Sequence, residues 1–181
     1  KMKEVREMLA DSGYEILSMK EAGVDLEIVE DGTTFEENAL IKARAVMEAT
    51  GELTLADDSG LEIDAFDGGP GVYSSRYLGE DTPYTEKNQI ILDKMKDVPE
   101  QERTARFVCV IAAIFPDGQT YTTRGTMEGI IGYEASGENG FGYDPIFYLP
   151  ELKKYSAQLS SNEKNELSHR GEALRKMKEV L

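Results

Sequence analysis

The alternation of apolar and polar positions along the chain predicts a mixture of helices and strands. Apolar residues recur at helical spacing in Met2–Leu9, Thr34–Thr50 and Thr85–Val98. The segment Arg106–Phe115 is almost wholly apolar, which is typical of a strand buried on both faces. After a Pro-Asp-Gly turn, Gln119–Arg124 alternates like a returning strand. This order of elements predicts an α/β fold with a hairpin in the middle and helices at both ends.

Two of the predicted helices begin at residues with the capping-box spacing. Thr34 and Glu37 have this spacing at the start of one helix, which Thr50-Gly51 would close. Ser160 and Glu163 have it again, and they predict a helix that runs to about Leu181. Short strands are expected at residues 14–17, 53–56, 61–64 and 146–149.

The charge of the chain excludes several classes of partner. Lys and Arg number 20 against 35 Asp and Glu, so the formal net charge is −15. A surface this acidic repels nucleic acid and anionic membranes. The nine-residue apolar run from Phe107 to Phe115 is too short to span a bilayer. We therefore expect no nucleic-acid and no membrane partner, although a divalent cation could still bridge the protein to a small polyphosphate.

The length and the cysteine usage of the chain predict one domain in a reducing compartment. A chain of 181 residues is long enough to bury a substantial core without disulfides. The single cysteine, Cys109, lies inside the apolar run and excludes an internal disulfide and a cysteine-based zinc cluster. This usage fits a cytoplasmic protein.

A pair of carboxylates is the first candidate for chemistry. Asp57-Asp58-Ser59-Gly60 follows a short apolar strand, and two carboxylates at a strand end can hold Mg²⁺, which prefers hard oxygen ligands. In a strand the two side chains would point to opposite faces, so only one would face a given cleft. The alternative is an ordinary Asx turn, which turn statistics favour when this segment is taken alone.

An acidic cluster flanks the start of the helix that follows Thr34. Its members are Glu30, Glu36, Glu37 and Asn38. A helix N-terminus favours phosphate, and nearby acids could complete a metal site. The alternative is helix capping together with a solvated acidic face.

Two further segments near the C-terminus could bind a ligand. In the glycine-rich loop Ser136–Pro145, backbone amides could approach a ligand, and Phe141 or Tyr143 could stack on a base. The loop is neither a P-loop nor a dinucleotide-binding fingerprint, and by itself it reads equally well as a long connection. Lys164 and Ser168-His169-Arg170 would lie near one side of a helix, or simply on a surface helix. The only histidine, His169, excludes a histidine-based zinc site.

Taken in order, these segments resemble one family over essentially the whole chain. The motifs Thr34–Asn38, Ala56–Leu61, Gly69–Tyr77 and Gly140–Pro145, followed by Glu163-Lys164 with Ser168-His169-Arg170, look like those of inosine triphosphate pyrophosphatases of the Ham1 type. Each motif is weak alone, but five motifs in the same order are highly specific.

The resemblance implies a fold and an activity. It implies homodimeric α/β enzymes with an elongated mixed central sheet, helices on both sides and two lobes around a nucleotide-binding cleft. Such enzymes hydrolyse non-canonical purine nucleoside triphosphates (ITP, dITP and XTP) to the monophosphate and pyrophosphate, and they use Mg²⁺. The whole chain, 1–181, would then be a single pyrophosphatase domain.

The resemblance also carries roles onto particular residues. It implies that Asp58 is the general base and a metal ligand, and that Glu30 is a second metal ligand. The substrate-binding positions that it implies are Lys1, Lys42, Ser59, Phe141, Gly142, Tyr143, Asp144, Lys164, His169 and Arg170.

One part of the family pattern is not in this sequence. The family opens with a strand and a phosphate loop, of which only the final lysine is present here, as Lys1. We therefore expect a strand and loop to be missing before residue 1. Two alternatives follow: a nucleotide-binding protein with impaired catalysis, and a related pyrophosphatase that acts on modified pyrimidines.

Overall fold

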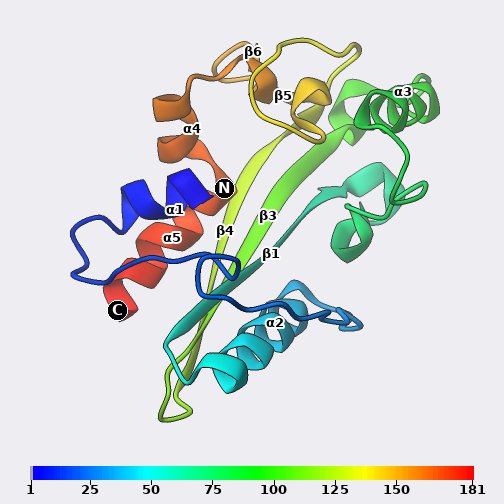
Figure 1. Cartoon of the computed structure of the whole chain (residues 1–181). Coiled ribbons are helices and arrows are strands. Elements are labelled where there is room, and N and C mark those ends of the chain that lie inside the picture. The colour runs from blue at the N-terminus through cyan, green and yellow to red at the C-terminus, as the bar shows by residue number, and fades with distance from the viewer. Residues whose placement is uncertain (1) are drawn as a thin grey trace. The chain divides into compact units, whose positions relative to one another are not determined.

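The computed structural model describes residues 2–181, so the predicted phosphate contact of Lys1 lies outside the described residues. A six-stranded sheet has the order β2-β1-β3-β4-β5-β6 (Figure 1). Its long strands are β1 (Thr54–Ile63), β3 (Thr104–Ile114) and β4 (Thr120–Ile131). The short strands are β2 (Gly69–Pro70), β5 (Phe147–Leu149) and β6 (Lys154–Tyr155), and the helices are α1 (Met2–Met8), α2 (Phe35–Thr50), α3 (Tyr84–Lys94), α4 (Ser161–Leu167) and α5 (His169–Val180). The predicted mixed α/β class is confirmed.

The described chain divides into two compact units. The first comprises residues 1–59, 109–125 and 169–181, and the second comprises residues 60–108 and 126–168. Strands β1, β3 and β4 each contribute residues to both units. The nucleotide-binding cleft between two lobes that the sequence implies stays a prediction.

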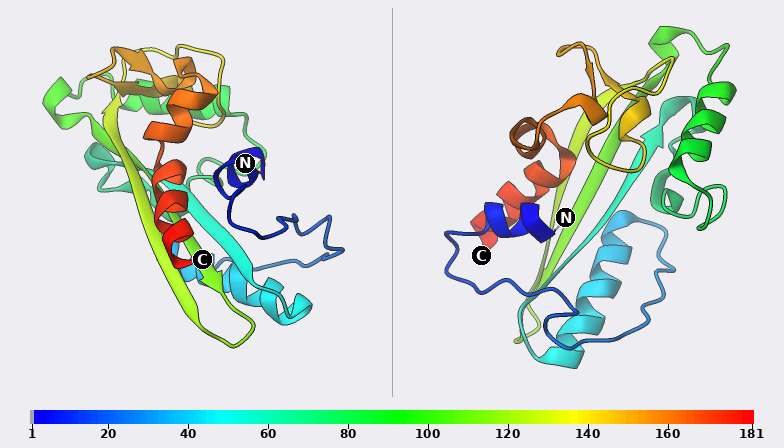
Figure 2. Two further views of the ribbon diagram at one scale, coloured as in Figure 1. Left: turned by 90° about the vertical axis from the view of Figure 1, so that its left-hand side faces the viewer. Right: turned by 45° about the horizontal axis from the view of Figure 1, so that its top comes forward.

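In the first unit, α5 packs on the middle of the sheet. Its residues Ala173, Leu174 and Met177 form a buried cluster with Cys109, Ile111 and Ala113 of β3. Val5 and Met8 of α1 extend this cluster, and Figure 2 shows α1 beside α5. Helix α2 lies on the other side of the strands of this unit (Figures 1 and 2).

The ends of α2 are where the sequence predicts them. The hydroxyl of Thr34 accepts a hydrogen bond from the backbone N–H of Glu37 at 3.1 Å. Gly51 adopts a left-handed conformation at the other end and donates to the carbonyl of Met47. These local contacts satisfy backbone groups that a helix end leaves unpaired.

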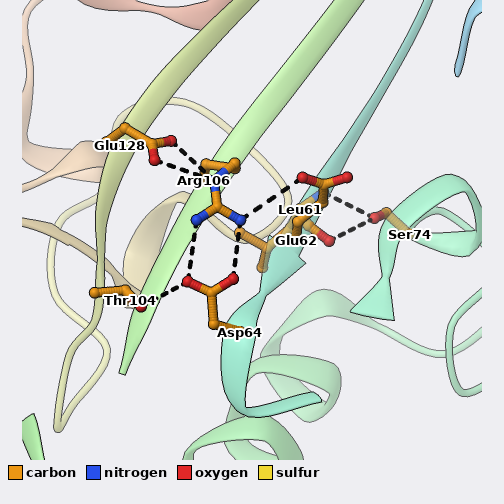
Figure 3. A network of polar contacts seen from close by, with 7 residues as sticks. All are labelled: Leu61, Glu62, Asp64, Ser74, Thr104, Arg106 and Glu128. Carbon is orange, nitrogen blue, oxygen red and sulfur yellow. Dashed lines mark hydrogen bonds and ion pairs between the residues drawn. The ribbon is translucent and has the colours of Figure 1, made fainter. Parts of the chain in front are cut away.

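The second unit has its own core, which lies between α3 and the parts of β1, β3 and β4 that belong to this unit. The fully buried residues there include Leu61 and Ile63 of β1, Ile91 of α3, Met95 directly after α3, and Phe147 of β5. The pairs β1–β2, β4–β5 and β5–β6 are antiparallel. On this unit Arg106 of β3 pairs with Glu128 of β4 and with Asp64, which directly follows β1, as Figure 3 shows.

Three expectations about local structure are wrong. The proposed Asx turn at residues 57–60 is continuous strand within β1. No strand forms at residues 14–17. The helix expected from Ser160 to Leu181 is broken at Ser168, which has an extended backbone (φ −71°, ψ 155°), so Lys164 lies on α4 and Arg170 on α5. Among residues 2–181, no helix is long and apolar enough to cross a membrane.

Candidate active site

The ammonium of Lys42 connects two carboxylates in the first unit. Lys42 lies on α2, and its Nζ is 3.1 Å from Glu30 Oε1 and 3.8 Å from Asp58 Oδ1. Glu30 comes from the irregular segment before α2, and Asp58 comes from β1. The structure therefore brings together three residues that the sequence assigned to metal and phosphate binding.

Asp58 is held in an environment that opposes its negative charge. Its side chain is only 12% exposed, and burial raises the pKa of its carboxyl above the ordinary value, although Lys42 and the Asn38 amide partly offset this. Its Oδ2 atom is buried and accepts no hydrogen bond from any residue between 2 and 181. A buried carboxylate oxygen without a donor is suited to take a cation or a proton.

Asn38 links Asp58 to the segment that carries Glu30. Its buried side chain lies near Asp58 and opposes the rise in the pKa of that carboxyl, while its Oδ1 accepts from the backbone N–H of Gly32 at 2.9 Å. A Cβ at Gly32 would lie 2.7 Å from Asn38 Oδ1, so only glycine allows this approach. Asn38 therefore lies between Asp58 and the segment that carries Glu30.

Asp57 points to a different partner from Asp58, as expected for neighbours in a strand. Its Oδ2 lies 3.8 Å from Arg170 Nε and accepts from the Ser59 hydroxyl at 3.4 Å. Arg170 also contacts Glu4 of α1 at 3.1 Å. Burial lowers the pKa of Arg170, but Asp57 and Glu4 outweigh it and hold that pKa above its usual range. His169, beside it at the start of α5, is buried.

The donor set around Asp58 fits Mg²⁺. Mg²⁺ in nucleotide enzymes is usually held by one or two carboxylates, with waters and substrate phosphates completing the coordination. Two such carboxylates are present here. One is Asp58, with its unpartnered oxygen, and the other is Glu30, which pairs with the same lysine, Lys42. Within residues 2–181 no group of three or more acidic, histidine or cysteine side chains could hold a metal unaided.

The other two acids of the predicted cluster lie elsewhere. Glu36 pairs with Arg124 at 2.7 Å. The Glu37 carboxylate accepts from the backbone N–H of Thr33 at 2.6 Å, and this hydrogen bond holds its pKa below the ordinary value. For these two residues the contacts match the alternative interpretation, in which they cap the helix and form part of a charged surface.

The second unit gathers the predicted residues of the glycine-rich loop around Asp144. This carboxylate is buried, and its Oδ2 accepts from Lys164 Nζ and from the backbone N–H of Phe141 at 2.9 Å. Its Oδ1 accepts from the buried hydroxyl of Ser156 at 2.6 Å. Asp144 therefore holds Lys164 and the loop backbone in place.

Gly140 allows this loop to close. It has a positive φ of +76°, and a Cβ there would lie 2.3 Å from Asp144 Oδ2 and 2.7 Å from Lys164 Nζ. Any larger residue would push the carboxylate and the ammonium away. The Lys164 ammonium lies 5.3 Å from the centre of the Phe141 ring.

The two aromatic residues of the loop have different environments. The Phe141 ring is 62% exposed, as a ring that stacks on an incoming ligand must be. Tyr143 is buried in the core of the second unit, and its hydroxyl donates to the carbonyl of Ser74. The sequence left both rings open as base-stacking candidates, and the structure leaves only Phe141 exposed.

Comparison with known proteins places the whole chain in one family. The model of the Ham1 family matches residues 1–180. The chain is 51% identical over 181 residues to a "dITP/XTP pyrophosphatase" of Desulforamulus reducens, covering 100% of this chain and 90% of the relative. The relative of the same name from Bacillus subtilis is 46% identical and is covered to 91%.

Solved structures agree with this result. A HAM1 protein from Coxiella burnetii matches with a TM-score of 0.91 at 42% identity, covering 99% of this chain and 91% of that one. The Ham1 protein of Staphylococcus aureus matches with a TM-score of 0.90 at 40% identity and the same coverage. The chain, with the α/β fold described above, therefore belongs to the Ham1 family.

Proposed function

We propose that this protein hydrolyses non-canonical purine nucleoside triphosphates (ITP, dITP and XTP) to the monophosphate and pyrophosphate. The observation that carries the proposal is Asp58, buried with one unpartnered oxygen and flanked by Lys42 and Glu30. Full-length relatives named "dITP/XTP pyrophosphatase" support the substrate class. The whole chain would act as a single pyrophosphatase domain.

Asp58 would act as the general base. It takes a proton from a water molecule while the water oxygen bonds to the α-phosphorus. The bond between the α-phosphorus and its bridging oxygen to the β-phosphorus breaks, and pyrophosphate leaves with that oxygen. The raised pKa of Asp58 favours proton acceptance over that of an ordinary carboxylate.

The surrounding charges would bind the substrate. Asp58 and Glu30 would hold Mg²⁺, which, when bound, neutralises phosphate charge and acidifies water. The Lys42 ammonium, 23% exposed, would offset the charge of the triphosphate. Ser59 would contribute a substrate contact near the base.

The base of the nucleotide would be bound by the remaining predicted residues. Phe141 would stack on the purine, and the backbone of Gly142 and Tyr143 would line it. Lys164, fixed by Asp144, would add a donor, and donors from His169 and Arg170 would select an oxygen at purine position 6 over the amino group of adenine.

The proposal includes a cytoplasmic homodimer. Gly69–Tyr77 with the following helix α3 is the candidate contact surface, because Tyr73, Tyr77 and Tyr84 supply aromatic anchors. Tyr73 is 56% exposed, and a concavity of about 190 Å³ is lined there by Pro70 and Tyr77. Light scattering at micromolar concentration tests it, and a monomer mass would count against it.

A substrate panel tests the proposed function. ITP, dITP, XTP, ATP, GTP and modified pyrimidine triphosphates are incubated with the protein and Mg²⁺, and pyrophosphate and orthophosphate are measured separately. We expect pyrophosphate from the first three at much higher kcat/KM. Binding of ITP without turnover would favour a nucleotide-binding protein with impaired catalysis, and a preference for pyrimidines would favour the related pyrophosphatase.

A further inference from the structure

Asn88 is a buried residue of α3 that contacts the glycine-rich loop. It is 3% exposed, and its Nδ2 donates to the carbonyl of Gly142 at 3.1 Å. The next loop residue, Tyr143, donates from its hydroxyl to the carbonyl of Ser74. Two hydrogen bonds from different segments therefore fix consecutive residues of the loop.

The second of these anchors is itself tied to α3. The buried ammonium of Lys87 donates to the carbonyl of Ser75 at 3.0 Å and lies 4.7 Å from the centre of the Tyr84 ring. The rings of Tyr84 and Tyr143 meet edge to face at 5.1 Å. Helix α3 thus holds the loop directly through Asn88 and indirectly through the segment that binds Tyr143.

Ser74 is in turn fixed to strand β1. Its hydroxyl accepts from the backbone N–H of Leu61 at 2.9 Å and donates to the carbonyl of Gly71 at 2.6 Å. Figure 3 shows the contact between Leu61 and Ser74. Leu61 follows Asp58 by three positions on this strand. The loop is therefore connected to β1 through Ser74.

The stability of the folded protein does not explain why residue 88 is an asparagine. Its Oδ1 is buried and has no hydrogen-bond partner among residues 2–181, and a buried acceptor without a donor costs free energy. A leucine has a similar volume and no such cost. The partner residue Gly142 is only partly buried, so water could hydrate its carbonyl if Asn88 were absent. What the amide contributes is the geometry of the loop.

We propose that Asn88 is a positioning residue that sets purine selectivity by holding Gly142 and the adjacent loop backbone. This inference rests on the proposed function, in which that loop lines the base. A polar site rejects the wrong base because its groups are left unpaired, and this penalty requires a loop that cannot shift to pair them again. Loosening the loop should therefore weaken binding of the correct base and leave the wrong base little affected.

The test compares Asn88→Leu and Tyr143→Phe with wild type. Tyr143→Phe removes only the hydroxyl that binds Ser74. The control is Gln89→Ala, the next residue of the same helix, which is exposed and whose side chain donates to Asp93 at 2.9 Å. For each protein, kcat and KM are measured with ITP and ATP, the melting temperature is recorded, and the affinities for IMP and AMP are determined by calorimetry.

For Asn88→Leu we expect KM for ITP to rise about 5- to 20-fold with kcat within about threefold, because misplaced positioning groups weaken binding of the selected base. The ITP-to-ATP ratio of kcat/KM should fall by a similar factor, and the melting temperature should equal or exceed that of wild type. Tyr143→Phe should act in the same direction, and Gln89→Ala should change nothing.

Two results would overturn the inference while wild type still hydrolyses ITP. One is an unchanged ITP-to-ATP ratio in Asn88→Leu. The other is a lower melting temperature with both substrates falling in parallel, which would make Asn88 structural only. If wild type does not hydrolyse ITP, the proposed function fails, and the IMP and AMP affinities decide this inference separately: an unchanged IMP-to-AMP ratio in Asn88→Leu overturns it, and a reduced ratio supports it.

Discussion

The ammonium of Lys42 lies 3.8 Å from Oδ1 of Asp58, while the second oxygen of that carboxylate is buried and accepts no hydrogen bond from the residues that the structure describes. A lysine at this distance keeps the carboxylate charged and usable as a base, and burial makes it a better one. The reaction requires both properties in the same group.

Replacing Asp58 by Asn should remove turnover and leave the fold intact. The amide is nearly isosteric but cannot accept the proton and, without a negative charge, binds a cation more weakly, so we expect kcat to fall by at least about 10²-fold. Turnover is measured at saturating Mg²⁺, with circular dichroism as the check on folding and Glu52→Gln, on the exposed surface before β1, as the control. Near-normal rates in Asp58→Asn would remove Asp58 from the mechanism.

Replacing Arg106 by Met should lower stability at neutral pH and much less in acid. Arg106 donates to both oxygens of Asp64 at 3.0 Å and to Glu128 (Figure 3), and these contacts hold the pKa of Asp64 below its ordinary value. A lowered folded-state pKa adds stability above the unfolded pKa of about 3.9, and that stability is lost as pH falls through the folded-state pKa.

We therefore expect Arg106→Met to lower the melting temperature by about 2–4 °C at pH 7, since partly exposed ion pairs contribute about 1 kcal/mol or less. The difference should shrink towards pH 2.5. Thermal unfolding at both pH values checks this, with Arg124→Met as the control on a more exposed pair with Glu36. An equal loss at both pH values would mean that packing of the Arg106 stem, rather than its charge, is responsible.

Replacing Arg103 by Met should be among the most destabilising changes in the second unit. Arg103 is 1% exposed and donates to the carbonyls of Met95, Val98, Ile131 and Gly132. Methionine fills part of the space but donates nothing, so buried carbonyls lose their partners at a cost of about 3 kcal/mol or more. This corresponds to a fall of about 6–12 °C in melting temperature. The exposed Arg44→Met should change it little.

The ends of the helices could be predicted from sequence because they depend on neighbouring residues. The Thr34 cap and the Gly51 end of α2 are set by side chains and backbone within one turn. The path of β1 through Asp57–Gly60 could not be predicted in this way. These residue types favour turns locally, but pairing with a distant strand and contacts to Arg170 and Lys42 keep them extended.

The candidate site could be predicted only as far as its motifs extend. Asp58 was found because it lies in the motif Ala56–Leu61, whereas Glu30 and Lys42 lie outside the quoted motifs and were assigned only by the wider resemblance. The structure adds that Lys42 contacts both carboxylates. Ser156 and Asn88 gave no signal, because a serine or an asparagine in sequence does not reveal that it binds Asp144 or Gly142 from a distant segment. The break at Ser168 was not predicted either, because helix propensity tolerates a serine inside a helix.

Replacing Arg170 by Ala should reduce the preference for ITP over ATP. Its guanidinium is 8% exposed and is oriented by Glu4 and Asp57, so its donors are fixed in position. If those donors select the oxygen at purine position 6, the ITP-to-ATP ratio of kcat/KM should fall about tenfold or more. A parallel fall for both substrates would instead assign Arg170 to phosphate binding or to structure. Arg175→Ala, on the exposed face of the same helix, is the control.

The most direct test of the central claim is to hydrolyse ITP in ¹⁸O-labelled water and locate the label by mass spectrometry. If Asp58 activates a water that attacks the α-phosphorus, one labelled oxygen enters IMP and the pyrophosphate is unlabelled. Label in pyrophosphate would mean attack at the β-phosphorus. Formation of IDP and labelled orthophosphate would mean attack at the γ-phosphorus. Either of these outcomes would contradict the account.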